Sequence, residues 1–338
     1  MLWIGFPCLD ASSLATCNSD DSQMECVQNN ERRTGSVFNN AIQLLQLFKP
    51  AMSVMENVVG LKSVSMRTGR SNHKACEDLV QAAGYLMVTL EISPEMFGIP
   101  QSRPRLYFLL FSMSFIAGLV QRHNLFGVEQ AVETMRAQIV LRMDRFASEV
   151  DVLDLKHFLL DEASEPVQSY YKSLPQTWEP RSVRDGEMWT NKLSPGYSPT
   201  EQDLSASPGV KALCWRQWDA LLAQGQQSTS SKAKAKMAPS NLSQDKDRIQ
   251  RVPGARSVPC QTPAAQTWLP SVQRLMHPIE SLRLQMMLGA EAEAAIMRDL
   301  KLGQIQKLSG NALNAHCSGV ALLVGFLALS AVAFPKKP

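Results

Sequence analysis

Apolar strands and amphipathic helices alternate along residues 1–112, and this order constrains the fold more than any other feature of the chain. Continuous apolar stretches predict strands, and apolar residues that recur on one helical face predict helices. The expected elements are strands at 2–6, 51–61, 86–92 and 105–111 and helices at 37–48 and 73–85. Such an order is typical of an α/β layer fold with a mostly parallel sheet. The last two strands are separated by only about a dozen residues, without a helix, so they could pair antiparallel.

The rest of the chain divides into two further segments. Residues 113–270 contain one expected helix, at 127–145, and become rich in loops after Pro166. Within this segment, residues 224–263 consist mainly of Gln, Ser, Lys, Ala and Pro, and we expect them to lack a fixed structure. They hold seven basic residues against two aspartates, which fits either a phosphate-binding patch or a solvated linker. Residues 271–338 are expected to return to the fold of the first 112.

Composition narrows the class of protein. The formal net charge of +3 does not mark a nucleic-acid binder, although charge can still be concentrated locally. The seven cysteines form no C-x-x-C pair, and no secretory signal opens the chain, which favours a reducing intracellular compartment and free thiols. The five histidines are scattered, so we expect no zinc site and no other metal.

Two apolar runs raise the question of a membrane segment. Leu106–Val120 is explained by a buried strand followed by a turn. Gly319–Phe334 spans 16 residues, or about 24 Å as a helix, which is short of the roughly 30 Å hydrocarbon core of a bilayer. We therefore expect a packed core helix that is partly uncovered. A short membrane anchor is the alternative, because Lys336 and Lys337 follow the run.

Four short motifs carry groups that can do chemistry. They centre on Cys8 in "GFPCLDAS", on Glu56 in "ENVVGL", on Gln101, Arg103 and Arg105 in "FGIPQSRPR", and on Asn311 in "LSGNAL". Each has a plain structural explanation: a buried thiol, a loop cap, surface charges at a hairpin, a turn. Their order and spacing favour a shared site, because ligands of open α/β sheets bind at the carboxyl ends of strands. Both Cys8 and Glu56 are expected at such ends.

At these motifs the chain resembles the cytosine-C5 DNA methyltransferase family. The family's nucleophile motif reads "GFPCQDFS", and this chain has Leu9 and Ala11 in place of the glutamine and phenylalanine. "ENV" followed by "GL", "FGxPQxRxR" and the basic stretch "ERRTGSVF" also match, while "ESLRLQMM" and "LSGNAL" match closing motifs loosely. The resemblance is strong over residues 1–112, weak over 275–330 and absent between them.

The resemblance implies a fold, a cofactor and a substrate. The fold would be a Rossmann-like methyltransferase sheet, with a loop-rich, target-recognition-like region inserted before the C-terminal helix. The methyl donor would be S-adenosylmethionine, and the acceptor would be a cytosine flipped out of DNA. An RNA acceptor is an alternative, because one branch of the family modifies transfer RNA. A nuclear or other DNA-containing compartment follows as the expected location.

The resemblance also implies roles for individual residues. Cys8 would add to cytosine C6 as the nucleophile, because an unaided C5 is too weak to take a methyl group. Glu56 would hydrogen-bond N3 and the amino group of the base, Arg105 would bind its O2 and orient Glu56, and Arg103 would assist. The resemblance further implies that the substrate contacts Pro7, Asn57 and Gln101, and that the cofactor contacts Asn311.

One expected motif does not occur in the sequence. The family builds much of its methyl-donor site from a "D-x-F-x-G-x-G" segment and the strands that follow it, and no such segment is found here. We therefore expect a sheet without its N-terminal strands. Either the sequence is a truncated fragment or a truncated gene model, or another chain supplies that half. The alternative is a catalytically inactive relative with a nucleic-acid-binding or regulatory role. The missing donor segment and the substitutions at Leu9 and Ala11 favour it.

Overall fold

The structure is a computed structural model that describes residues 1–7, 24–123, 127–173, 239–241, 257–269, 271–272 and 274–334. Contacts divide the chain into two compact units. The first comprises Met1–Phe97, Pro104–Asp151 and His316–Pro338, and the second comprises Gly98–Arg103 and Val152–Ala315. Residues 113–151 therefore group with the first unit, whereas the sequence places the divisions at residues 112 and 270.

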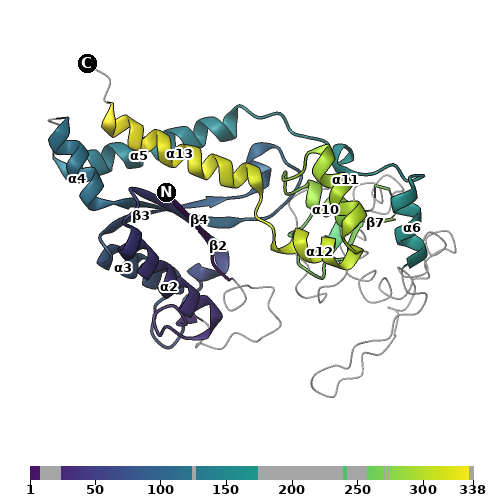
Figure 1. The fold of residues 1–338 in the computed structure, drawn as a ribbon, viewed down its shortest axis with the longest axis horizontal. Helices are drawn as coiled ribbons and strands as arrows, with labels where there is room; N and C mark the ends of the chain where they lie inside the picture. The colour runs from purple at the N-terminus through teal and green to yellow at the C-terminus, as the bar shows by residue number, and fades with distance from the viewer. Residues whose placement is uncertain are drawn as a thin grey trace, which may run out of the picture. The chain divides into compact units, whose positions relative to one another are not determined.

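The first unit is built on a four-stranded sheet with the order β1-β2-β4-β3 (Figure 1). Its strands are β1 (Leu2–Gly5), β2 (Met52–Val58), β4 (Arg105–Ser112) and β3 (Tyr85–Ile92). All four strands lie where the sequence predicts them.

The sheet is mixed: β1, β2 and β3 run in one direction and β4 runs against them, which includes the antiparallel pairing of the last two strands that the sequence left open. Only β1 and β2 pair in parallel, whereas β4 is antiparallel to both β2 and β3. The connection between β3 and β4 is too short for a crossover helix, so β4 returns alongside β3 and enters the sheet between β3 and β2.

Two helices cover one face of this sheet, α2 (Arg32–Phe48) and α3 (Asn72–Ala82). Helix α2 begins five residues before the expected start at 37. The turn after α3 ends at Gly84, which has a φ of +83°, a conformation that glycine adopts without strain. The core between these helices and the sheet contains buried side chains from both, including Phe38, Leu45, Val80, Met55, Phe108 and Leu110.

The opposite face is covered by α4 (Met113–Arg122), α5 (Val128–Ser148) and α13 (Ala315–Ala333) (Figure 1). The expected helix at 127–145 corresponds to α5. The expected turn after β4 is instead helix α4, which begins because the Ser112 side chain accepts a hydrogen bond from the Phe115 N–H and caps the first turn. The core of this face contains Val54, Tyr107, Leu109, Phe111, Met135, Ile139, Val320 and Val324.

Helix α13 packs tightly on the sheet, as a core helix is expected to. Gly325 lies so close to the Met52 side chain that a Cβ atom there would be 2.1 Å from its terminal methyl. The other side of the helix leaves Leu323 and Phe326 each 44% exposed. Within the described residues, the helical stretch Leu302–Ala333 is long and apolar enough to cross a membrane by length and composition. This is weak evidence, because a core helix passes the same test.

Two short 3-10 helices connect the elements of the first unit. One, η1 (Val59–Lys62), follows β2 directly, and the other, η2 (Pro94–Phe97), follows β3. Both place loops at the edge of the sheet where β2 ends and β4 begins.

The elements of the second unit that lie within the described residues are short. Its helices are η3 (Leu155–Phe158), α6 (Glu165–Ser173), α10 (Pro278–Arg283), α11 (Ala290–Asp299) and α12 (Leu302–Asn311). Strands β5 (Ser240–Asn241), β6 (Thr267–Leu269) and β7 (Arg274–Leu275) form a small antiparallel sheet. Of the stretch 224–263 expected to lack structure, residues 224–238 and 242–256 lie outside the described residues, whereas β5 is paired with β6.

Candidate active site

The parallel pairing of β1 and β2 brings two of the predicted motifs to one edge of the sheet. Gly5 at the end of β1 is paired with Glu56, near the end of β2. Phe6 and Pro7 continue from β1, and Cys8 follows them. Cys8, together with Leu9 and Ala11, lies outside the described residues. The chain entering Cys8 and the Glu56 carboxylate therefore belong to the same edge of the sheet.

The Asn57 side chain forms hydrogen bonds with the protein's own backbone. It is buried, and its side-chain nitrogen donates hydrogen bonds to the carbonyl oxygens of Phe6 at 3.0 Å and Pro7 at 3.5 Å. Its side-chain oxygen accepts a hydrogen bond from the Val58 N–H at 2.8 Å. The amide thus fixes the backbone that leads into Cys8. The sequence prediction of a substrate contact for Pro7 and Asn57 remains untested.

Glu56 and Arg105 form an ion pair across the antiparallel strands β2 and β4. Arg105 Nε lies 3.3 Å from Glu56 Oε1, and both side chains are largely buried. Arg105 Nη1 also donates a hydrogen bond to the Pro104 carbonyl at 2.8 Å, which helps to fix the guanidinium. A carboxylate held beside an arginine suits recognition of a base through hydrogen bonds, because the pair offers both acceptors and donors.

Two neighbours shape the surroundings of this ion pair. Tyr107 is paired with Glu56 in the sheet and is buried, and this burial raises the pKa of its hydroxyl, with Cys317 and Glu56 adding to the effect. Gly5, on the other side of Glu56, is exposed, and a Cβ atom placed there would meet no atom of the described residues within 4 Å. Among those residues, the strand position beside the carboxylate is open.

Gln101 and Arg103 belong to the second unit and have different surroundings. Gln101 is fully buried and its backbone pairs with Val258, and within the described part of the chain neither polar atom of its side-chain amide has a hydrogen-bond partner. The Arg103 guanidinium is also buried and donates to main-chain carbonyls, including those of Gly310 and Ala312. Their predicted roles at the substrate stay predictions.

Asn311 is the last residue of α12 and is exposed. Its side-chain amide makes no hydrogen bond to the residues that the structure describes, so it can bind a ligand. The backbone beside it is closely packed, since a Cβ atom at Gly310 would lie 2.1 Å from the Pro263 nitrogen. An exposed amide can make one polar contact with S-adenosylmethionine, and the cofactor role of Asn311 stays a prediction. Across the described ranges, no group of three or more His, Cys, Asp and Glu side chains could hold a metal ion.

Sequence reasoning missed a buried carboxylate in the segment before α2. Glu25 accepts hydrogen bonds from Ser65 Oγ at 2.7 Å and Thr68 Oγ1 at 3.0 Å and forms an ion pair with Arg67. The hydrogen bonds from Arg67 and Ser65 lower the pKa of Glu25 to about 2. This cluster joins the segment before α2 to the loop after η1. Nothing in the spacing of these residues signals the contact.

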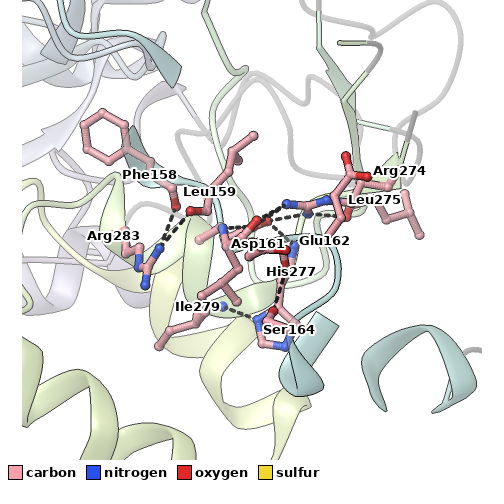
Figure 2. A network of polar contacts seen from close by, with 12 residues as sticks. Phe158, Leu159, Asp161, Glu162, Ser164, Arg274, Leu275, His277, Ile279 and Arg283 are labelled. Carbon is pink, nitrogen blue, oxygen red and sulfur yellow. Dashed lines mark hydrogen bonds and ion pairs between the residues drawn. The ribbon is translucent and has the colours of Figure 1, made fainter. Parts of the chain in front are cut away.

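A second network lies in the second unit (Figure 2). Arg274 donates to both carboxylate oxygens of Glu280, at 2.8 and 2.6 Å, and Glu280 also accepts from the Leu160 N–H and the His277 N–H. His277 Nδ1 in turn accepts from the Ile279 N–H and caps α10. Burial lowers the pKa of His277 to about 4. The acidic residue three positions after the cap is the sequence signal that could have revealed this capping box.

Several solved structures are similar to this chain at low identity. A Dnmt2 methyltransferase from S. pombe is 15% identical, with a TM-score of 0.46 over 98% of this chain and 77% of its own. The Entamoeba histolytica methyltransferase EhMeth is 14% identical, with a TM-score of 0.44 over 99% and 77%. An E. coli prophage protein described as a putative DNA modification methyltransferase is 14% identical, with a TM-score of 0.40 over 86% and 72%.

Family membership rests on sequence, because each of these TM-scores is below 0.5. No curated protein sequence matches the chain significantly. The sequence profile described as C-5 cytosine-specific DNA methylase matches residues 1–314, a range that includes Cys8, Glu56, Arg105 and Asn311. The chain therefore belongs to the C-5 cytosine-specific DNA methylase family.

Proposed function

We propose that the chain is a DNA cytosine-C5 methyltransferase that uses S-adenosylmethionine and forms a covalent adduct through Cys8. The observation that carries the proposal is the ion pair between Glu56 and Arg105, with 3.3 Å between Arg105 Nε and Glu56 Oε1. It lies at the same sheet edge as the Phe6–Pro7 backbone, which Asn57 holds. A nucleophile directly after Pro7 would thus start from a fixed backbone beside a base-binding pair.

The chemistry follows from the weak nucleophilicity of cytosine C5. The Cys8 thiolate adds to C6, and the electrons of the C5–C6 double bond make C5 a nucleophile. Glu56, protonated or sharing a proton, donates a hydrogen bond to N3 and accepts one from the amino group, which stabilises the addition intermediate, and Arg105 binds O2. When bound, S-adenosylmethionine would supply the methyl group and be left as S-adenosylhomocysteine. Transfer of the C5 proton to water then expels the Cys8 thiolate and restores the aromatic base.

The open strand position at Gly5 supports entry of a planar base. The exposed glycine next to Glu56 leaves space where any other residue would project a side chain. A flipped base needs such space, since it must reach the carboxylate from outside the duplex. A Gly5→Val variant should fill this space and weaken capture of the base without touching the Glu56–Arg105 pair.

Trapping on fluorinated DNA tests the proposal. The full chain is incubated with S-adenosylmethionine and duplex DNA containing 5-fluorocytosine, which blocks release of the C5 substituent and so preserves the Cys8 adduct. We expect an adduct that survives denaturation and is lost in Cys8→Ser. A matched 5-fluorocytosine RNA separates the two substrates, because an adduct with RNA alone would assign the chain to RNA instead.

A second candidate is a relative that binds nucleic acid without methyl transfer, and Leu9 and Ala11 in the nucleophile motif favour it. It predicts DNA binding in a gel shift that S-adenosylmethionine does not change. The absence of any adduct, combined with DNA binding that is equal in wild type and Cys8→Ser, would support this candidate and reject the first. As a DNA enzyme or a DNA-binding relative, the chain would act in the nucleus or another compartment that contains DNA.

A further inference from the structure

We propose that Arg103 is a positioning residue. It binds the carbonyls of the C-terminal turn of α12, Gly310–Ala312, and thereby holds the Asn311 side chain in place for S-adenosylmethionine. The inference rests on the proposed function, since it assigns a task to Asn311 in cofactor binding. It gives Arg103 a role other than the one expected at the cytosine.

The contacts of Arg103 enclose Asn311 on both sides along the chain. Arg103 Nη2 donates to the Gly310 carbonyl at 3.2 Å and to the Ala312 carbonyl at 2.8 Å. Because these two carbonyls belong to the residues before and after Asn311, one nitrogen atom fixes the backbone that carries the Asn311 side chain.

The other end of the guanidinium is anchored in the same unit. Arg103 Nη1 donates to the Gln261 carbonyl at 2.9 Å and lies 3.6 Å from Cys260 Sγ. Arg103 is only 4% exposed. Its terminal nitrogens thus point at the protein's own backbone, which suits a supporting role better than contact with a base.

The end of a helix is a favourable place for this guanidinium. The last carbonyls of α12 have no partner further along the helix, and the C-terminal end of a helix carries partial negative charge, so a cation there is stabilising. The planar fork of arginine can bind several carbonyls at once, which the single ammonium group of lysine cannot. Lysine at this position should therefore keep the charge and lose the grip.

Gly310 provides a second support for the same turn. A Cβ atom at Gly310 would lie 2.1 Å from the Pro263 nitrogen and 2.3 Å from the Thr262 carbonyl carbon. The backbone of 262–263 therefore packs directly against one side of the turn. With Arg103 holding two of its carbonyls, the turn is fixed while the Asn311 side chain stays exposed.

The test compares Arg103→Lys, Asn311→Ala and the double variant in the full chain. Isothermal titration measures the Kd for S-adenosylmethionine, and gel shift measures the Kd for cytosine-containing duplex DNA. We expect Arg103→Lys to raise the cofactor Kd about tenfold and to leave the DNA Kd within about twofold. The double variant should bind the cofactor no more weakly than Asn311→Ala alone, because Arg103 acts through Asn311.

Hydrogen exchange gives a measurement that needs no ligand. The Ala312 N–H donates to the Leu308 carbonyl at 2.8 Å, so its exchange rate reports the order of the turn. Exchange at Ala312 should become faster in Arg103→Lys. Arg283→Lys is the matched control, since Arg283 also donates to two carbonyls, those of Phe158 and Leu159, and it should leave both Ala312 exchange and the cofactor Kd unchanged.

Three results would overturn the inference. A weaker DNA Kd with an unchanged cofactor Kd in Arg103→Lys would place Arg103 at the substrate. Additive effects in the double variant would show that Arg103 does not act through Asn311. Unchanged Ala312 exchange would show that Arg103 does not hold the turn. By contrast, a wild-type chain that binds DNA but not S-adenosylmethionine refutes the proposed methyl transfer. In that case, Ala312 exchange in Arg103→Lys alone shows whether Arg103 orders the turn Gly310–Ala312.

Discussion

Replacing Asn57 with aspartate should destabilise the first unit, because it removes a donor from a buried position. Asn57 is 1% exposed, and its nitrogen donates to the Phe6 carbonyl at 3.0 Å. Aspartate has nearly the same size and still accepts from the Val58 N–H, but it turns a carboxylate oxygen toward the Phe6 carbonyl. The substitution therefore removes the donated hydrogen bond with little change in packing, and it also places a carboxylate in a buried position.

Two contributions set the lower bound of the effect, and burial of the new carboxylate adds to them. The lost hydrogen bond accounts for about 1 kcal/mol, and a buried carbonyl left without a donor costs about 1–3 kcal/mol more. From these two contributions alone, the free energy of unfolding should fall by about 2–4 kcal/mol. That is a large part of the roughly 5–15 kcal/mol that stabilises a typical protein.

Urea unfolding, followed by circular dichroism, measures this change. The midpoint for Asn57→Asp should move to lower urea while the slope stays the same. Asn40→Asp is the control, because Asn40 is an exposed residue of α2 and the same chemical change there should cost less than about 0.5 kcal/mol. If the two variants unfold at the same urea concentration, Asn57 does not hold the backbone before Cys8.

Three further outcomes are expected. Burial lowers the pKa of His277 from 6.5 to about 4, so neutral His277 contributes fully to the free energy of unfolding above pH 6.5, and about 3 kcal/mol of that free energy is lost as the pH falls from 6.5 to 4. His277→Asn can still cap α10 and should make the free energy of unfolding less dependent on pH in this range. An unchanged pH dependence in this variant would contradict the assignment to His277. Glu56→Gln should keep the fold but reduce 5-fluorocytosine trapping at least about a hundredfold, because general acid catalysis contributes effects of that order. If the variant forms the adduct as fast as the wild type, Glu56 is excluded from catalysis. Gly310→Ala should lower the thermal midpoint by several degrees, because its Cβ atom would collide with backbone. Gly303→Ala, in the same helix, has no atom of the described residues within 4 Å of its Cβ position and should not lower the midpoint. Equal midpoints for the two variants would contradict the packing at Gly310.

The elements of the first unit could be predicted well because their signals are local. Apolar runs located all four strands, and the apolar residues that precede Glu56 were enough to assign its motif to the end of β2. The direction of β4 was harder to predict. Its pairing with both neighbours depends on where a returning strand enters the sheet, which the order of elements along the chain does not specify.

Side-chain contacts with distant backbone were the main gap. Nothing in the spacing of the motifs indicates that Asn57 donates to the Phe6 carbonyl or that Arg103 donates to the carbonyl of Ala312, more than two hundred residues away. Such contacts depend on which segments the tertiary fold brings together. The resemblance to a family supplied residue types for a site, and the structure supplied the partners of those residues.

The placement of α13 has a consequence for folding during synthesis. This last helix covers a face of the sheet whose strands end at Ser112, and the whole of Val152–Ala315 is translated in between. At about 5–20 residues per second, the ribosome needs roughly 8–30 s for those residues. Throughout that time Val54, Leu109 and Phe111 lack their final cover, so the nascent chain presents an apolar surface to which chaperones bind. Slower translation of the second unit should therefore lower the yield of soluble protein.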